Sequence, residues 1–126
     1  MAVETTVAET TAVAIMAAMT SVAMTETGTV VNNAVDAGPF GTVLYTLTFG
    51  KTVDAAGETG PHTIRGQCFS PDGTTLTFVG GGTWRNRGHR RELKHVTVLS
   101  DGQRTFAVEN LDFAAQTASG TIYGLE

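Results

Sequence analysis

Residues 74–100, TTLTFVGGGTWRNRGHRRELKHVTVLS, decide the fold of this chain. An apolar run leads into three consecutive glycines and Trp84, and a second apolar run follows a basic segment. Three glycines in a row let the backbone turn sharply, or approach a neighbouring strand or a ligand closely. The stretch therefore predicts two β-strands, 74–79 and 92–99, separated by the glycines and the basic segment.

The basic segment carries most of the positive charge of an acidic protein. Residues 84–95 contain five Lys and Arg residues and one Glu, whereas the whole chain has a net charge of −4. Because phosphate contacts need a basic surface and only this segment is basic, we expect no nucleic-acid binding. Two interpretations stay open: a solvated loop, or a site where arginines bind an anionic or enolate group beside Trp84.

Turn and strand signals recur on both sides of this stretch. The clearest strand is 42–49, in which Val43, Tyr45, Leu47 and Phe49 occupy every second position. Turn sequences at 70–73 and 100–103 predict two hairpins. About seven to nine short strands, with a turn about every 8 to 12 residues, are typical of a closed sheet. The sequence predicts an all-β fold, a small antiparallel β-barrel of about eight strands.

The first 26 residues are rich in Ala and Thr and include all four methionines. Their apolar residues fit both a helical face and an alternating strand, so we interpret 1–26 as an N-terminal arm or extra strand beside a barrel domain at 27–126. The uncharged part, 10–25, is too apolar to be left in water, which predicts packing on the barrel or in a homo-oligomer. It lacks a basic leader region and is too short for a membrane span, and we expect a cytoplasmic protein without membrane contact.

Metal, disulfide and cofactor chemistry have little support in the sequence. Cys68 is the only cysteine, which excludes a disulfide within the chain, and we expect it to be a small buried apolar residue. No two of the three histidines have the spacing that would place both on one strand face, so we expect no metal site. Phosphate-loop and nucleotide-binding motifs are absent, so we expect no cofactor.

Several side chains are candidates for acid–base chemistry in a barrel lumen. The candidate catalytic residues are Glu109, Asp112, His62 and His95. Burial of either carboxyl group would raise its pKa toward the range that suits proton transfer. The candidate substrate-binding residues are Tyr45, Arg65, Trp84 and Arg85. The acids also have an ordinary interpretation as rim carboxylates, and Trp84 as a core residue closing a barrel end.

Two motifs resemble those of known small barrels. Gly81-Gly82-Thr83-Trp84, with Arg87-Gly88 after it, resembles the glycine-rich motif of the allene oxide cyclase and dirigent group, although Trp84 replaces the fourth glycine. Gly28-Thr29-Val30-Val31 is similar to a strand near the start of dirigent domains. The segment 82–88 also resembles the opening strand of avidins and, more loosely, the Gly-x-Trp motif of lipocalins. All these families imply a small antiparallel barrel with a ligand at one end.

The resemblance to the cyclase and dirigent group implies a cofactor-free cyclase or isomerase. Its substrate would be a small hydrophobic molecule, polyketide-like or lipid-like, held in the lumen. The arginines beside Trp84 would suit an anionic head on that molecule. The alternatives are a non-catalytic carrier of the same shape and a structural subunit whose N-terminal arm holds an oligomer. A ligand-sized lumen would separate the first two from the third, and an acid–base group inside it would separate enzyme from carrier.

Overall fold

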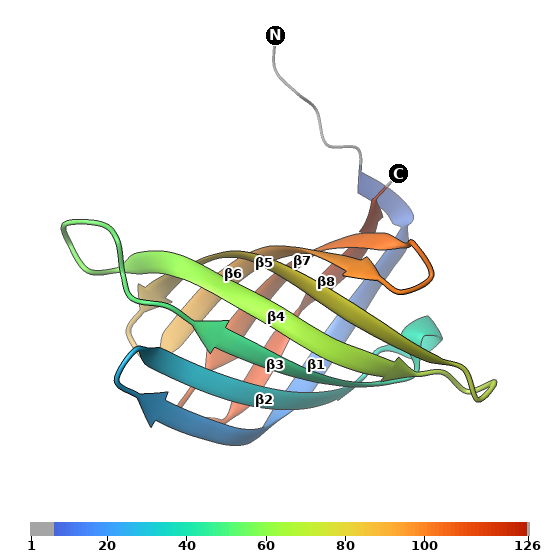
Figure 1. The fold of residues 1–126 in the computed structure, drawn as a ribbon, viewed down its shortest axis with the longest axis horizontal. Coiled ribbons are helices and arrows are strands. Elements are labelled where there is room, and N and C mark those ends of the chain that lie inside the picture. The colour runs from blue at the N-terminus through green and yellow to red at the C-terminus, as the bar shows by residue number, and fades with distance from the viewer. Residues whose placement is uncertain (1–6, 126) are drawn as a thin grey trace, which may run out of the picture.

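The computed structural model describes the backbone of residues 7–125 and the side chains of residues 12–125. Within this part of the chain, eight antiparallel strands form a closed barrel in which each strand pairs with its neighbours in sequence and β8 pairs with β1 (Figure 1). This confirms the predicted all-β barrel. The strands are β1 (Val7–Thr25), β2 (Gly28–Asp36), β3 (Thr42–Phe49), β4 (Thr59–Phe69), β5 (Thr75–Arg87), β6 (Arg90–Leu99), β7 (Arg104–Asp112) and β8 (Thr117–Leu125).

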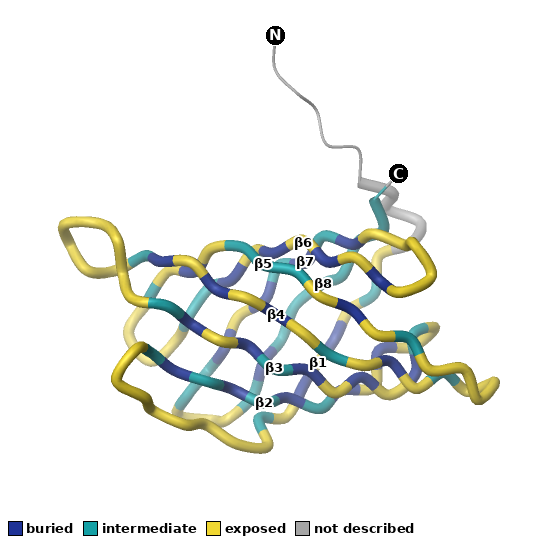
Figure 2. The backbone as a smooth tube through the Cα atoms, in the orientation of Figure 1, coloured by how far each residue is buried: buried dark blue, intermediate teal, exposed yellow. Residues whose placement is uncertain are grey.

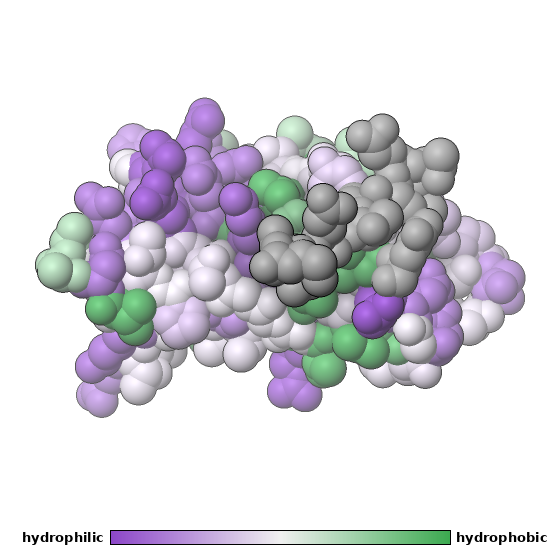
Figure 3. Space-filling view, turned by 90° about the horizontal axis from the view of Figure 1, so that it is seen from above, coloured by the Kyte–Doolittle hydropathy of each residue, from purple (hydrophilic) through white to green (hydrophobic). Residues whose placement is uncertain are grey.

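Buried and exposed residues alternate along the strands, because one face of the sheet lines the lumen and the other faces water (Figure 2). Along β3, Val43, Tyr45, Leu47 and Phe49 are all buried, as their spacing predicted. The outer face carries threonines and charged residues. On the side seen in Figure 3, patches of apolar side chains lie between them.

The N-terminal segment is an integral part of the barrel. β1 pairs with β2 along one edge and with β8 along the other, and Ile15 and Ala17 on β1 are buried. The boundary expected at 26/27 falls in the turn between β1 and β2. Residues 7–25 therefore form a strand, one of the two conformations that the sequence of the segment allowed, and this strand closes the sheet.

The glycine-rich stretch is more regular than its sequence suggested. β5 continues through Gly80, Gly81 and Gly82 to Arg87, and the chain turns only at residues 88–89. The glycines therefore provide close approach between strands instead of a turn. A Cβ atom at Gly82 would lie 1.8 Å from the carbonyl oxygen of Lys94 on β6.

Different connections lie at the two ends of the barrel. We call the end with the loop 50–58 and the turn 88–89 the loop end. We call the other end, where β1 begins and β8 ends, the terminus end (Figure 1). A short 3-10 turn, η1 (Gly38–Phe40), joins β2 to β3 at the terminus end. Within the described residues, no helix has the length and apolar character that a membrane span requires.

Candidate functional site

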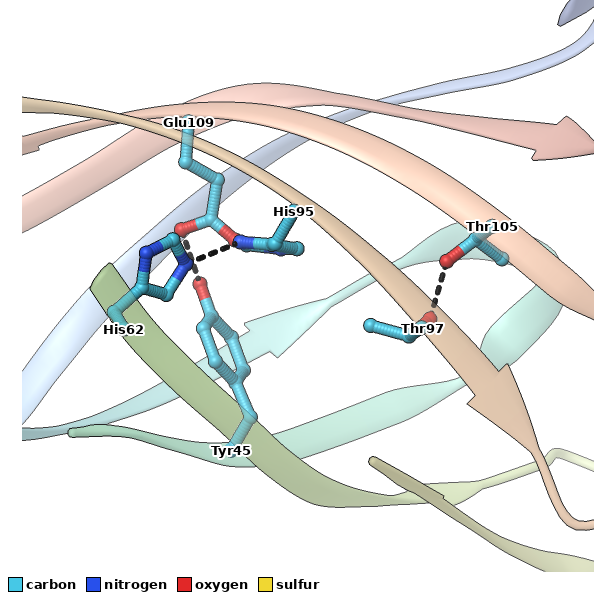
Figure 4. A network of polar contacts seen from close by, with 6 residues as sticks. All are labelled: Tyr45, His62, His95, Thr97, Thr105 and Glu109. Atoms are coloured by element: carbon cyan, nitrogen blue, oxygen red, sulfur yellow. Dashed lines mark hydrogen bonds and ion pairs between the residues drawn. The ribbon is translucent and has the colours of Figure 1, made fainter. Parts of the chain in front are cut away.

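Four polar side chains meet inside the barrel, and we call them the lumen chain: Tyr45, His62, His95 and Glu109 (Figure 4). The Tyr45 hydroxyl donates a hydrogen bond of 3.0 Å to Glu109 Oε2. His95 Nε2 lies 3.7 Å from Glu109 Oε1, and His95 Nδ1 lies 3.1 Å from His62 Nε2. All four residues are at most 5% exposed. Because β3 and β7 lie four strands apart in a closed barrel of eight, the Tyr45–Glu109 bond crosses the lumen.

A glycine brings the two histidines together. Gly82 on β5 pairs with His62 on β4 and with His95 on β6, so the three residues lie side by side on adjacent strands. The position faces the lumen but has no side chain, and the two imidazole rings therefore meet across it, with centroids 5.3 Å apart. The triple glycine thus has a specific local role, which is to let the two histidines touch.

Small residues also flank the other half of the lumen chain. Gly120 on β8 pairs with Glu109, and a Cβ atom there would lie 2.1 Å from the carbonyl oxygen of Val108. Gly66 on β4 pairs with Tyr45, and the Phe78 ring packs against it. Because Gly66 and Gly120 carry no side chain, they leave space in the lumen, which the longer side chains of Tyr45 and Glu109 fill.

The environment of Glu109 makes its carboxyl group unusual. Burial raises the pKa of Glu109 from 4.5 to about 7, and the hydrogen bond from Tyr45 opposes part of this rise. Burial, and then the charge of Glu109, raise the pKa of Tyr45 well above 10. Near neutral pH Glu109 therefore exchanges between its acid and base forms, while Tyr45 remains a hydrogen-bond donor.

The two histidines are neutral near pH 7. Burial lowers the pKa of His62 to about 4, and burial together with the neighbouring His62 lowers the pKa of His95 to about 3. The contact between His95 and Glu109 is therefore not a pair of full opposite charges. It joins a neutral imidazole to a carboxyl group in either protonation state.

The lumen chain has two consistent proton arrangements. When Glu109 is ionised, His62 Nε2 can donate to His95 Nδ1, and His95 Nε2 then presents its proton to the carboxylate. When Glu109 is protonated, the bond between the rings can reverse, and the unprotonated His95 Nε2 then faces the carboxyl group at 3.7 Å. The tautomers of both histidines are thus linked to the protonation of Glu109.

A cavity of about 50 Å³ lies on the terminus side of the lumen chain. Tyr45, His95 and Glu109 line it, together with the hydrogen-bonded pair Thr97 and Thr105 seen farther along the barrel in Figure 4. The remaining walls are mainly apolar: Ile15, Val35, Phe40, Val43, Ile64, Cys68, Phe78, Leu99, Ala107 and Ile122. The cavity is about a third of the size of an engineered apolar cavity of about 150 Å³ that binds benzene, so it suits a molecule or a group of only a few heavy atoms.

Buried polar atoms without partners lie on Asn33, beside the lumen chain, and on His62, within it. Among the described residues, neither amide atom of Asn33 nor Nδ1 of His62 has a hydrogen-bond partner. Burial and the charge of Glu109 raise the pKa of Tyr45, and the nearby Asn33 side chain opposes part of that rise. In Figure 4 the second ring nitrogen of His62 points away from His95. Buried polar atoms without partners are uncommon, and these are available to a ligand or to water.

Trp84 closes the loop end of the barrel. Its indole N–H donates a 2.9 Å hydrogen bond to the carbonyl oxygen of Pro61, and its ring meets Phe49 edge to face with centroids 5.8 Å apart. Trp84 is 5% exposed and does not line the cavity. Its position matches the interpretation as a core residue at a barrel end.

Three other candidate residues lie outside the lumen. Arg65 on β4 and Arg85 on β5 are exposed on the outer face of the barrel. Asp112 lies at the loop end, where Oδ1 accepts the backbone N–H groups of Ala114 and Ala115 and Oδ2 lies 3.8 Å from Arg90 Nε. The structure thus brings together Tyr45 and three of the four candidate catalytic residues. Their roles stay predictions.

The sequence reasoning missed the contribution of Arg91. Its guanidinium Cζ lies 4.2 Å, 4.6 Å and 5.0 Å from the ring centroids of Trp84, Phe49 and Phe113. Arg91 Nε also donates to Asn86 Oδ1 at 3.1 Å. A signal was present, because Arg91 occupies the same alternate phase of β6 as Leu93 and His95, which face inward.

No group of three His, Cys, Asp or Glu side chains within the described residues is arranged to hold a metal ion. In comparisons with known proteins, the chain matches no family model, no curated protein and no solved structure. The resemblance of its motifs to the allene oxide cyclase and dirigent barrels therefore stays a prediction.

Proposed function

We propose that this protein is a cofactor-free barrel enzyme, a cyclase or isomerase that moves a proton on a small substrate in its lumen. The observation that carries the proposal is Glu109, which faces the cavity, is 2% exposed and has a pKa of about 7. A general acid–base group acts best when its pKa lies near the working pH, because both of its forms are then populated.

The proposed step begins when the Glu109 carboxylate removes a proton from a carbon next to a carbonyl group. The C–H bond breaks, its electron pair moves onto the carbonyl oxygen, and the substrate becomes an enolate. The neutral His95 offers an N–H group to that oxygen, and Tyr45 holds the carboxyl group in place. When the substrate has a carbon–carbon double bond next to the carbon that lost the proton, the enolate is a dienolate. Glu109 then returns the proton to the far carbon of that double bond, and the double bond shifts into conjugation with the carbonyl group, so the substrate is isomerised without a change in composition. A simple ketone takes the proton back on the same carbon and shows only exchange.

The lining of the cavity favours an uncharged substrate. Among the described residues that line it, Glu109 is the only acidic side chain, and none is Lys or Arg. A carboxylate head in this cavity would face Glu109 without a compensating cation, which is unfavourable in an apolar environment. The volume of about 50 Å³ further favours a small ketone or aldehyde, or one such group of a larger molecule.

The test is the exchange of carbon-bound protons of acetone and butanone in heavy water, followed by proton NMR. The wild-type protein is expected to accelerate exchange, and Glu109→Gln to lose about 100-fold or more of that acceleration, because the amide keeps the shape but accepts no proton. Asp112→Asn changes a carboxyl group on the same strand that lies at the loop end, and it serves as the matched control.

Equal exchange rates for the wild-type protein and Glu109→Gln would overturn the proposal. Binding of butanone by both proteins without any exchange would indicate the alternative, a non-catalytic carrier. Calorimetry or ligand-detected NMR on the same samples distinguishes these outcomes.

A further inference from the structure

The two ends of the barrel are closed in different ways. At the loop end, the Trp84 ring packs against Gly60, its N–H group is bonded to Pro61, and the Arg91 guanidinium lies against the Trp84 and Phe49 rings. The cavity lies on the other side of the lumen chain from these residues. A ligand arriving from the loop end would have to separate this packed group and then pass His62.

The terminus end is covered by a small, self-contained turn. Phe40 lines the cavity and is the last residue of η1, which begins at Gly38 and is followed by Gly41; these two glycines have φ values of 55° and 76°. The hydrogen bonds of this turn join only residues 36–41: Ala37 N to Gly41 O, Phe40 N to Ala37 O, Gly41 N to Gly38 O, and Gly38 N to Asp36 Oδ1.

This bonding pattern allows the turn to move as a unit. Displacing it from the barrel breaks none of these hydrogen bonds. It removes the packing of the Phe40 ring against the cavity and, at the base of the turn, the contacts of the buried Ala37 and of Gly41, which lies close to the Phe69 carbonyl group. The Phe40 ring is only partly buried, and the two glycines adopt positive φ angles at little cost. Short flanking segments of this kind absorb the backbone changes of a hinged loop.

We infer that ligands reach Glu109 from the terminus end by displacement of the 38–41 turn, and that Phe40 sets the size of molecule that the cavity admits. The inference deepens the proposed function, because it assigns the access route and a specificity-determining residue to the same site. Small uncharged molecules pass when the turn moves slightly, whereas larger ones require the Phe40 ring to leave the cavity wall.

Cys68 provides a direct measurement of access. It is the only cysteine of the chain, it is 4% exposed, and it lines the same cavity as Phe40. Its reaction with a thiol reagent therefore reports how often the cavity opens. Methyl methanethiosulfonate is a small uncharged reagent, and dithiobis(nitrobenzoate) is a large anionic one. The wild-type protein is expected to react measurably with the first and much more slowly with the second.

Phe40→Ala is expected to accelerate the reaction of Cys68 with the large reagent at least tenfold and to reduce the preference for the small one. Phe40→Leu retains most of the apolar packing, and its labelling rate is expected to lie between those of the wild-type protein and Phe40→Ala. It provides the test if the alanine variant is unstable. Phe113→Ala is the matched control, because it removes a phenylalanine that packs on Arg91 at the loop end. Rates are compared at urea concentrations where labelling does not depend on urea, so that global unfolding does not contribute.

Unchanged Cys68 rates in both Phe40 variants, or an equal acceleration by Phe113→Ala, would overturn the inference. The measurement is independent of catalysis, because the reaction of Cys68 with a thiol reagent requires no proton transfer by Glu109. The proton-exchange experiment tests the proposed function, and Cys68 labelling tests the access route, so either can fail without the other.

Discussion

Gly82 and Glu109 show how single residues create the polar interior of this barrel. Gly82 contributes no side chain, and this absence lets His62 and His95 touch from the strands on either side. Glu109 has the opposite character, because it carries an ionisable group into a site where burial moves its pKa to about 7. The missing side chain of Gly82 and the buried carboxyl group of Glu109 thus both shape the lumen chain.

Gly82→Ala should destabilise the protein by roughly 3 kcal/mol, because the new Cβ would lie 1.8 Å from a backbone oxygen of β6 and the strands would have to separate. Gly81→Ala is the control, since its Cβ points outward and meets a single oxygen at 2.9 Å. Urea unfolding measures both variants. Equal losses would show that the lumen position of Gly82 has no special importance.

Glu109→Gln should change the pH dependence of stability in a defined direction. The native pKa of Glu109, about 7, lies above its ordinary value of 4.5, so its contribution is fully present below about pH 4.5 and is lost as pH rises through 7. Glutamine has no such loss. The variant should therefore gain on the order of 3 kcal/mol relative to wild type between pH 4.5 and 8. Urea unfolding at pH 5 and pH 8 tests this, and a difference that does not vary with pH would contradict it.

At the scale of elements, strand phase separates what the sequence could predict from what it could not. The clean alternation of β3 predicted its buried face, and turn residues predicted the β4–β5 and β6–β7 hairpins. β1 stayed ambiguous because Ala, Thr and Met fit both periodicities, and its strand form depends on pairing with β8 at the far end of the sequence. Such distant pairing leaves no local signal.

Strand phase also explains on which face of the sheet the candidate site residues lie. Trp84 and Arg85 are adjacent in one strand, so they point to opposite faces, and an inward Trp84 places Arg85 outside. Arg65 likewise alternates with the buried Ile64. Residue type and strand position indicated five lumen candidates, of which four lie in the lumen and Asp112, the last residue of β7, lies at the loop end. The four are Tyr45, His62, His95 and Glu109. Their contacts depend on the register of four strands, which the sequence alone did not provide.

Arg91→Ala should destabilise the loop end by about 1 to 2 kcal/mol, because the guanidinium and its aliphatic stem lose contact with three aromatic rings. Arg85→Ala, on the outer face of β5, should change stability by less than about 0.5 kcal/mol. Urea unfolding compares the two variants, and Trp84 fluorescence reports the local change. Comparable effects of both substitutions would show that Arg91 is an ordinary surface residue.

For the whole molecule, closure by β1 is the dominant feature. The pairing of β1 with β2 and β8 leaves no unpaired strand edge, and it holds both ends of the described chain at the same end of the barrel (Figure 1). Val7 pairs with Leu125 across this seam. The predicted homo-oligomer stays a prediction, which light scattering of the full chain would test.

Deleting residues 1–25 should abolish cooperative unfolding, because it removes β1 and exposes the edges of β2 and β8. The control is a circular permutant that keeps every strand, joins the original termini by a short linker and begins at residue 73 in the β4–β5 turn. This permutant should fold and melt cooperatively in circular dichroism. A deletion variant that melts like the full chain would contradict the closed barrel.

The central claim is that the lumen holds a carboxyl group poised between its acid and base forms, and carbon-13 NMR titration of the Glu109 side chain tests it most directly. With Glu109→Gln used to assign the signal, the carboxyl resonance of the wild-type protein should titrate with a midpoint near pH 7. A midpoint near 4.5, the ordinary value for glutamate, would contradict the claim and remove the basis for proton transfer in this barrel.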